Sequence, residues 1–327
     1  MVWTVGLSNL VLAVYGFTLI IGLPANILAF YTFFQKIRQQ STPMDMLLLS
    51  LTVSDLILFF FLPIRMVEEA NMKRTMPYFL CLLSVFIFYS VIGNSSLHLM
   101  AISVERYLGV AFPIKYKLKR NPRNAVIACV MFWVVSMAHG SIVYIIQYHD
   151  HLNPNITDPS KRNTCHEEFT TEQLKILLPF HLELSIVFFC IPFLICCFCY
   201  IKCICILFRL SKVHSKKRYR ATGMALGTLL VFVITFMPNS ISYVEGYVGG
   251  YSTKWKKYAL LTSTLNACLN PLIFYFSSSA LRETFKKVLQ ELVGRLLPLC
   301  CRSAPCCPLF NRGKSEERTQ SSDDRFL

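Results

Sequence analysis

Seven apolar blocks, each long enough to cross a lipid bilayer, divide this chain. Short segments rich in turn-forming and charged residues separate them, and the blocks lie near residues 8–34, 43–67, 77–104, 124–147, 174–208, 222–248 and 257–276. About twenty helical residues cross the hydrocarbon of a membrane. Because backbone polar groups in the bilayer must find partners within the protein, such blocks fold as helices. The sequence therefore predicts an all-α membrane protein, a seven-transmembrane helix bundle.

The distribution of charge sets the orientation of the bundle. Only 16% of the 327 residues are charged and 54% are hydrophobic, which is unlike a soluble domain of this length. Most of the 33 lysines and arginines flank the blocks on one side or lie in the tail. Positive charge marks the cytoplasmic side, so we expect the N-terminus outside and the C-terminus inside. Most of the basic residues therefore lie at the cytoplasmic membrane surface. The net charge of +15 is explained by this placement and does not indicate a nucleic-acid partner.

The chain divides into three parts. Residues 1–276 carry the seven blocks, and residues 277–297 alternate apolar and charged side chains at helical spacing. That pattern predicts a short amphipathic eighth helix on the inner leaflet, in contact with membrane lipid. Residues 298–327 form a cysteine-containing and then disordered tail, in which Cys300 and Cys301 are candidates for palmitoylation. A zinc knuckle is the alternative, but the spacing of the tail cysteines does not suit one.

Two features belong to the outer face in this orientation. Cys81 and Cys165 both lie there, in an oxidising compartment, and we expect a disulfide between them. Asn155 begins an Asn-Ile-Thr glycosylation sequon in the same outer loop as Cys165.

Ionisable and polar residues inside the blocks are the candidates for function. Glu105 and Arg106 end the third block at the depth where lipid tails give way to head groups, and Asp55 is a lone carboxylate deep in the second. Asp55 must face the interior and needs partners there, and the alternative is a protonated carboxyl in a hydrogen-bond network. A lone histidine in the outer third of the bundle would indicate a structural role, but three aligned basic or phenolic groups there favour a pocket for a small anion. The residues of this pocket are Arg65, Tyr89, His139, Tyr144, Gln147, His181, Glu183, Tyr243 and Lys256.

The motifs together resemble the rhodopsin-like (class A) family of G protein-coupled receptors. They are Gly22-Leu23-Pro24-Ala25-Asn26, Leu51-Thr52-Val53-Ser54-Asp55, Glu105-Arg106-Tyr107, Trp133, Pro192, Tyr200, Pro238 and Asn270-Pro271, in family order over nearly the whole chain. The resemblance implies a plasma-membrane receptor, not an enzyme, with a heterotrimeric G protein and arrestin as partners. It also implies an allosteric sodium ion at Asp55, Ser95, Asn266 and Asn270, and no other metal or cofactor. It implies a G protein switch made of Glu105, Arg106, Tyr107, Tyr200, Phe274 and Tyr275.

Two positions depart from the family pattern. Phe274 stands where many relatives have tyrosine, and Phe236 stands where the usual toggle residue is tryptophan.

Three stretches are similar to the short-chain free fatty acid receptors (types 2 and 3): SVERYLGVAFPIKYKL, LLPFHLELSIVFFCIP and FYFSSS. This resemblance implies a receptor for acetate, propionate and butyrate that couples to Gi/o-type and also Gq-type G proteins. In that subfamily two arginines and a histidine hold the carboxylate, and the matching positions here are His181, Lys256 and Tyr243. Arginine offers a bidentate fork, whereas lysine is a point charge and histidine titrates near neutral pH. We therefore expect weaker or more pH-dependent carboxylate binding.

Three other functions compete with this interpretation. A rhodopsin-like receptor for a different small anionic or lipid ligand would share every motif above. A polytopic transporter would also be cationic, but the sequence has no internal repeat and seven spans do not divide into equal halves. An intramembrane enzyme would need a nucleophile or metal motif, such as His-Glu-x-x-His or Gly-x-Ser-x-Gly, and the sequence contains neither.

Overall fold

The computed structural model describes residues 5–71, 77–119, 121–152, 171–209, 215–253, 255–277, 281–288 and 290. The secondary structure of these residues is helical. The helices are α1 (Val5–Gln39), α2 (Pro43–Asn71), α3 (Tyr78–Ala111), α4 (Pro113–Lys119), α5 (Pro122–Leu152), α6 (Thr171–Ser185), the π-helical turn η2 (Ile186–Cys190), α7 (Ile191–Arg209), α8 (Ser215–Gly249) and α9 (Lys256–Ser277).

The seven predicted spans are confirmed as helices. Six helical stretches in the described part of the chain are long and apolar enough to cross a membrane, and one of them, Glu172–Arg209, joins α6, η2 and α7. The seventh span is α9, whose 22 residues would extend about 33 Å. It carries the polar residues Asn266 and Asn270. The short helix α4 connects α3 to α5.

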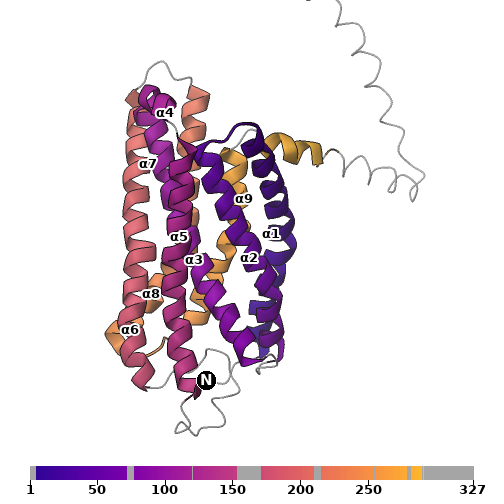
Figure 1. Cartoon of the computed structure of the whole chain (residues 1–327), viewed down its shortest axis with the longest axis vertical. Coiled ribbons are helices and arrows are strands. Elements are labelled where there is room, and N and C mark those ends of the chain that lie inside the picture. The colour runs from indigo at the N-terminus through magenta and orange to yellow at the C-terminus, as the bar shows by residue number, and fades with distance from the viewer. Residues whose placement is uncertain are drawn as a thin grey trace, which may run out of the picture. The chain divides into compact units, whose positions relative to one another are not determined.

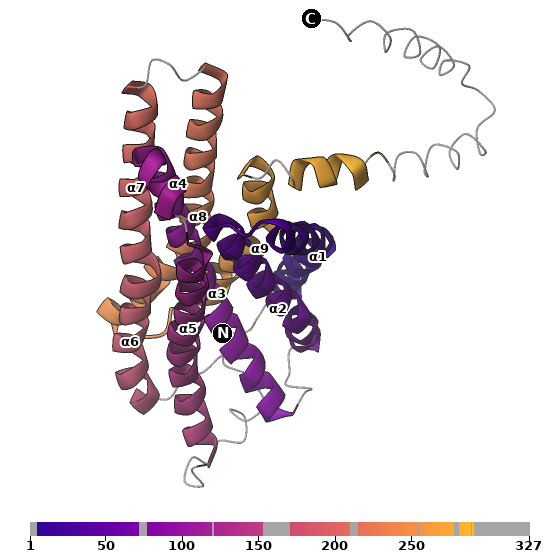
Figure 2. The same cartoon turned by 45° about the horizontal axis from the view of Figure 1, so that its top comes forward.

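Helix α3 is the centre of the bundle. It packs against α2, α5 and α7, and α1 closes the ring between α2 and α9. In the most apolar stretch of α3, 72% of the residues are buried, against 50% or less in the five other stretches. Figures 1 and 2 show the long helices side by side, with α3 among α2, α5 and α8 in the tilted view.

The interior of the bundle is held by polar contacts as well as by packing. Asn94 Nδ2 of α3 donates to Ser54 Oγ of α2 at 2.9 Å. The His98 ring lies between the Asn94 carbonyl, at 2.8 Å, and Ser50 Oγ of α2, at 2.9 Å. Since lipid tails are as apolar as leucine, close packing and hydrogen bonds are what favour helix association in a membrane. The polar residues of α3 therefore explain why it occupies the centre.

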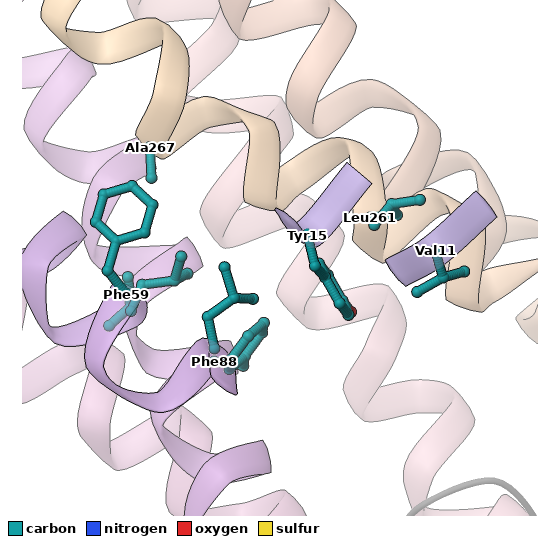
Figure 3. Close-up of a cluster of buried hydrophobic side chains, with 9 residues drawn as sticks. Val11, Tyr15, Phe59, Phe88, Leu261 and Ala267 are labelled. Atoms are coloured by element: carbon teal, nitrogen blue, oxygen red, sulfur yellow. The ribbon is translucent and has the colours of Figure 1, made fainter. Parts of the chain in front are cut away.

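A hydrophobic cluster fixes the outer half of α9 against α1, α2 and α3. Figure 3 labels six of its side chains: Val11, Tyr15, Phe59, Phe88, Leu261 and Ala267. All are buried. Because Leu261 lies about one turn and a half beyond the start of α9, this packing also positions Lys256, the first residue of that helix.

The fifth span contains an irregularity that the sequence did not predict. Its block of residues 174–208 is interrupted by the π-helical turn Ile186–Cys190, directly before Pro192. Ser96 Oγ of α3 donates to the Phe188 carbonyl at 2.5 Å, which gives a partner to a backbone group in this turn. The side chain of Phe188 lies against Gly93, where an added Cβ would stand 2.9 Å from the ring.

Several sequence-based predictions lie outside the described residues. These are Cys165, Asn155, Cys300, Cys301 and the tail of residues 298–327, and the side chain of Gln147 is also outside them. Cys81 is disulfide-bonded. Of the predicted amphipathic segment, Ser277 ends α9 and residues 281–288 are helical. The chain divides into two compact units at that point, Met1–Leu281 and Arg282–Leu327.

Candidate functional site

Four predicted pocket residues from four helices meet at the outer end of the bundle. Lys256 Nζ of α9 lies 3.1 Å from His181 Nε2 of α6. The same ammonium lies over the Tyr243 ring of α8, 5.4 Å from its centroid, and over the Tyr89 ring of α3, at 6.0 Å. The rings of His181 and Tyr243 are stacked, with centroids 4.5 Å apart and planes 6° from parallel. We call these four residues the lysine cluster.

The connection between α8 and α9 places Lys256 beside Tyr243. Glu245, near the end of α8, accepts hydrogen bonds from Trp255 Nε1 at 2.7 Å and from the Tyr251 hydroxyl at 3.2 Å. The hydrogen bond to Glu245 raises the pKa of Tyr251. Gly250 has φ of +70°, a conformation that glycine adopts without strain. The tight turn therefore brings the first residue of α9 back to the level of Tyr243.

A cavity adjoins the lysine cluster: Tyr89 and Tyr243 line it, whereas His181 and Lys256 lie behind these two rings and not in its lining. Its volume is about 40 Å³, which is room for about three water molecules. Tyr89 and Tyr243 form its outer wall, and the apolar part of its lining comes from Ile92, Val143, Leu184, Phe188, Phe189 and Phe236. The cavity thus suits a ligand of a few non-hydrogen atoms with a mostly apolar body.

The side wall of the cavity contains a second ionisable pair. His139 of α5 lines the cavity, and its Nε2 atom lies 3.0 Å from Glu183 Oε1 of α6. The Nδ1 atom of His139 contacts the carbonyl of Val135 at 2.7 Å. Both ring nitrogens are therefore engaged, and the Glu183 side chain remains half exposed.

Two predicted pocket residues have other neighbours. Arg65 lies over the Phe88 ring, 5.4 Å from its centroid, and 3.8 Å from Glu68, one turn along its own helix. Tyr144 packs edge-on against Phe86, with centroids 6.4 Å apart. Neither residue lines the cavity.

Sequence reasoning missed the polar residues of the cavity wall. Ser136, Asn239 and Ser240 line the cavity, as do Gly93 and Gly140. Two signals could have found them. Ser136 and Asn239 are polar residues inside apolar spans, which usually face the bundle interior. Gly140 allows α5 to approach α3, because a Cβ at this position would overlap Ser90 Oγ.

The predicted sodium-site residues are buried together in the bundle. Asn270 Nδ2 donates to Asp55 Oδ2 at 2.8 Å. Three other buried oxygens, Asp55 Oδ1, Asn266 Oδ1 and Asn270 Oδ1, accept no hydrogen bond within the described structure. Ser95 is also buried. Carboxylate, amide and hydroxyl oxygens are the ligands that a hard cation prefers, so this set of donors fits a sodium ion.

The predicted switch residues lie at the opposite end of the bundle. Arg106 Nη1 of α3 donates to Thr228 Oγ1 of α8 at 3.4 Å. Glu105 accepts a hydrogen bond from the Tyr116 hydroxyl of α4 at 2.5 Å.

The remaining switch residues are mainly packing residues. Tyr107 contacts Phe198 edge-on, and the fully buried Phe274 contacts Phe33 in the same way. Tyr200 is buried and Tyr275 is partly buried.

Comparison with known proteins gives a consistent result. Residues 25–274 match the family described as "7 transmembrane receptor (rhodopsin family)". The chain is 42% identical to Free fatty acid receptor 3 of Mus musculus over 290 residues, which is 88% of either chain. It is 44% identical to Free fatty acid receptor 2 of Homo sapiens over 290 residues, 87% of this chain and 86% of that one. Free fatty acid receptor 1 of Mesocricetus auratus is 30% identical over 286 residues, 84% of this chain and 94% of that receptor.

Proposed function

Because the chain belongs to the rhodopsin family of seven-transmembrane receptors, we propose that it senses small extracellular carboxylates and signals through a heterotrimeric G protein. The names of the similar receptors give free fatty acids as their ligands. In this proposal the receptor lies in the plasma membrane with its N-terminus outside, and short-chain fatty acids such as acetate, propionate and butyrate are its agonists. Gi/o-type and also Gq-type G proteins, and arrestin, bind the cytoplasmic end.

The lysine cluster is the observation that carries this proposal. A carboxylate at the outer end of the cavity would face the Lys256 ammonium and the His181 ring, with Tyr89 and Tyr243 on either side of the ammonium. A hydrogen bond to a charged group contributes about 1.5–3 kcal/mol, or roughly ten- to hundredfold in affinity. The small adjoining cavity then limits the length of the alkyl chain.

Activation of a G protein by a series of one- to eight-carbon carboxylates tests the proposal. We expect a response to the short members, and we expect Lys256→Ala to weaken it about ten- to hundredfold. Lys175→Ala is the matched control, because Lys175 also lies on the outer side but is exposed and paired with Glu172 at 2.9 Å. Equal effects of the two substitutions, at equal surface expression, would rule out the lysine cluster as the anion site. If no carboxylate of the series activated the wild-type receptor, carboxylates would be ruled out as the ligand.

The same proposal includes an allosteric sodium ion. Asp55, Ser95, Asn266 and Asn270 would hold it, since their buried oxygens suit a hard cation and Asp55 supplies the charge. A cation bound between α2, α3 and α9 would stabilise one packing of these helices relative to any packing that lacks the site. The ion would thus act on the receptor's activation equilibrium and not on the carboxylate directly.

A further inference from the structure

The inner wall of the cavity carries polar atoms that the protein itself does not satisfy. Ser136 Oγ of α5 and Asn239 Oδ1 of α8 are buried and have no hydrogen-bond partner among the described residues. Both residues line the cavity. Buried polar atoms in native proteins are nearly always hydrogen-bonded, so we expect these two atoms to have a partner inside the cavity.

Asn239 and Ser136 lie deeper in the bundle than Tyr243 and His139. Chain direction runs outward in α8, so Asn239 lies one turn, about 6 Å, deeper than Tyr243. Chain direction runs outward in α5 too, and Ser136 lies about one turn deeper than His139. The lysine cluster therefore stands at the outer end of the cavity, and Asn239 and Ser136 stand about one turn further in.

An unsubstituted alkyl chain is a poor match for this inner wall. It would cover the Asn239 carbonyl oxygen and the Ser136 hydroxyl without offering either a hydrogen bond, which is unfavourable for both. A hydroxyl both donates and accepts, so a ligand hydroxyl is complementary to the Asn239 oxygen and to the Ser136 hydroxyl. The rest of the lining is apolar, so a single polar group on an otherwise apolar body fits the cavity best.

We propose that the cavity is built for short hydroxycarboxylates, whose carboxylate faces Lys256 while a hydroxyl on the third or fourth carbon reaches Asn239 and Ser136. The inference rests on the proposed function, because the carboxylate is what places the hydroxyl at the right depth. A hydroxyl on the second carbon stays at the level of the carboxylate and so remains about one helical turn short of Asn239. The position of the hydroxyl, and not only its presence, therefore sets potency.

Four ligands of equal chain length test this inference on the full-length receptor in membranes: butanoate and its 2-, 3- and 4-hydroxy derivatives. Their potencies are measured by G protein activation. We expect the 3- or 4-hydroxy compound to be about three- to tenfold more potent than butanoate, the contribution of one hydrogen bond. We expect no such gain from the 2-hydroxy compound.

Two substitutions connect the gain to the inner wall. Ser136→Ala and Asn239→Leu should each reduce the ratio of the potency of the hydroxylated ligand to that of butanoate, measured in the same variant, to less than about twofold. Ser141→Ala is the matched control for Ser136→Ala, because the Ser141 hydroxyl bonds the Ala138 carbonyl of its own helix at 2.7 Å. Should Asn239→Leu fail to reach the surface, Ser136→Ala alone still decides the question.

Two results would overturn the inference. One is a wild-type receptor for which no hydroxylated ligand exceeds butanoate, as expected if ordered water already satisfies the inner wall. The other is a hydroxyl advantage that persists in both variants. In either case the carboxylates would still activate the receptor. If the proposed function itself were wrong, no carboxylate would activate it, so the two failures are distinguishable.

Discussion

The ammonium of Lys256 and the imidazole of His181 face one another at 3.1 Å, with Nζ directed at Nε2. When Lys256 carries its proton, the ammonium can only donate, so the His181 ring accepts from it. A carboxylate ligand must therefore compete with His181 for one of the Lys256 protons. The charge state of His181 decides how strong that competition is.

Carboxylate potency should rise as the pH falls. Histidine is the side chain that ordinarily changes its charge between about pH 5 and 8. Once His181 carries a proton on Nε2 it no longer accepts from Lys256, and both groups then present donors to the ligand. We expect roughly tenfold higher potency at about pH 6 than at about pH 7.5, since one charge-assisted hydrogen bond is gained. The ligand itself stays mostly ionised over this range.

The measurement is a set of dose–response curves across that pH range. His181→Arg should be potent at neutral pH and flat across the series, because arginine stays charged. A wild-type potency that does not change with pH would contradict the proposed competition between His181 and the ligand.

Sodium should lower agonist affinity through Asp55. If the cation favours the resting arrangement of α2, α3 and α9, replacing sodium by choline should raise agonist affinity about five- to tenfold, a typical coupling between two sites. Asp55→Asn should abolish this difference because it removes the charge that holds the ion. The measurement is agonist affinity, from radioligand or fluorescent-ligand binding, in sodium and in choline salt for the wild type and for Asp55→Asn. A sodium effect that survives Asp55→Asn would place the ion elsewhere.

The contact between Arg106 and Thr228 should restrain resting activity. This hydrogen bond at 3.4 Å joins α3 to α8, and its length indicates a weak restraint. Thr228→Val removes it with little change in shape, and we expect the ligand-free signal to rise about two- to fivefold. Thr18→Val is the control, since the Thr18 hydroxyl bonds the Val14 carbonyl of its own helix, at 2.7 Å. A basal signal that falls in Thr228→Val would mean that this contact supports the active arrangement.

The disulfide at Cys81 should be required for a stable receptor, with Cys165 as its expected partner. Closing a loop of roughly 80 residues stabilises by about 4 kcal/mol if the benefit is mainly chain entropy. Cys165→Ser should therefore reduce surface expression and thermal stability about as much as Cys81→Ser. Cys190→Ser, at a free and exposed cysteine, should have no such effect. If only Cys81→Ser were damaging, Cys81 would have another partner.

Gly140 should be intolerant of a side chain until Ser90 is shortened. A Cβ at residue 140 would overlap Ser90 Oγ, so Gly140→Ala forces α3 and α5 apart and should destabilise by about 1–3 kcal/mol. Ser90→Gly removes the overlapping atom, which has no hydrogen-bond partner in the described structure, and should restore much of the lost stability. Melting temperatures of the two single variants and the double variant give the coupling. Purely additive effects would show that the two residues do not meet.

The helices and the depth of each residue were predictable, but the neighbours of each side chain were not. Apolar blocks must be helical in a bilayer, so the spans followed from the sequence. Arg65, Tyr144 and His181 were all predicted to lie in the outer third. Only His181 belongs to the lysine cluster, because the rotation of each helix depends on packing that no single block specifies. Arg65 is instead occupied by Glu68 and Phe88.

Two further features could not be read from the sequence for a related reason. The π-helical turn Ile186–Cys190 lies in an uninterrupted apolar run, and nothing in the residue pattern distinguishes it from an α-helical turn. The role proposed for Asn239 and Ser136 depends on the cavity that α3, α5, α6, η2 and α8 enclose around them. Both features are products of tertiary packing and not of local propensity.

The π-helical turn also makes the fifth span sensitive to its exact length. Such a turn holds one residue more than an α-helical turn, so deleting a single residue between Ile186 and Cys190 could restore a regular helix without breaking the span. Every residue on one side would then be turned by about 100° relative to the other side. If the part before the turn rotated, His181 and Glu183 would lose their present neighbours. If the part after it rotated, Tyr200 would lose its neighbours instead. A one-residue indel here would thus uncouple the outer half of this span from its cytoplasmic half, although it would look harmless in an alignment of apolar segments.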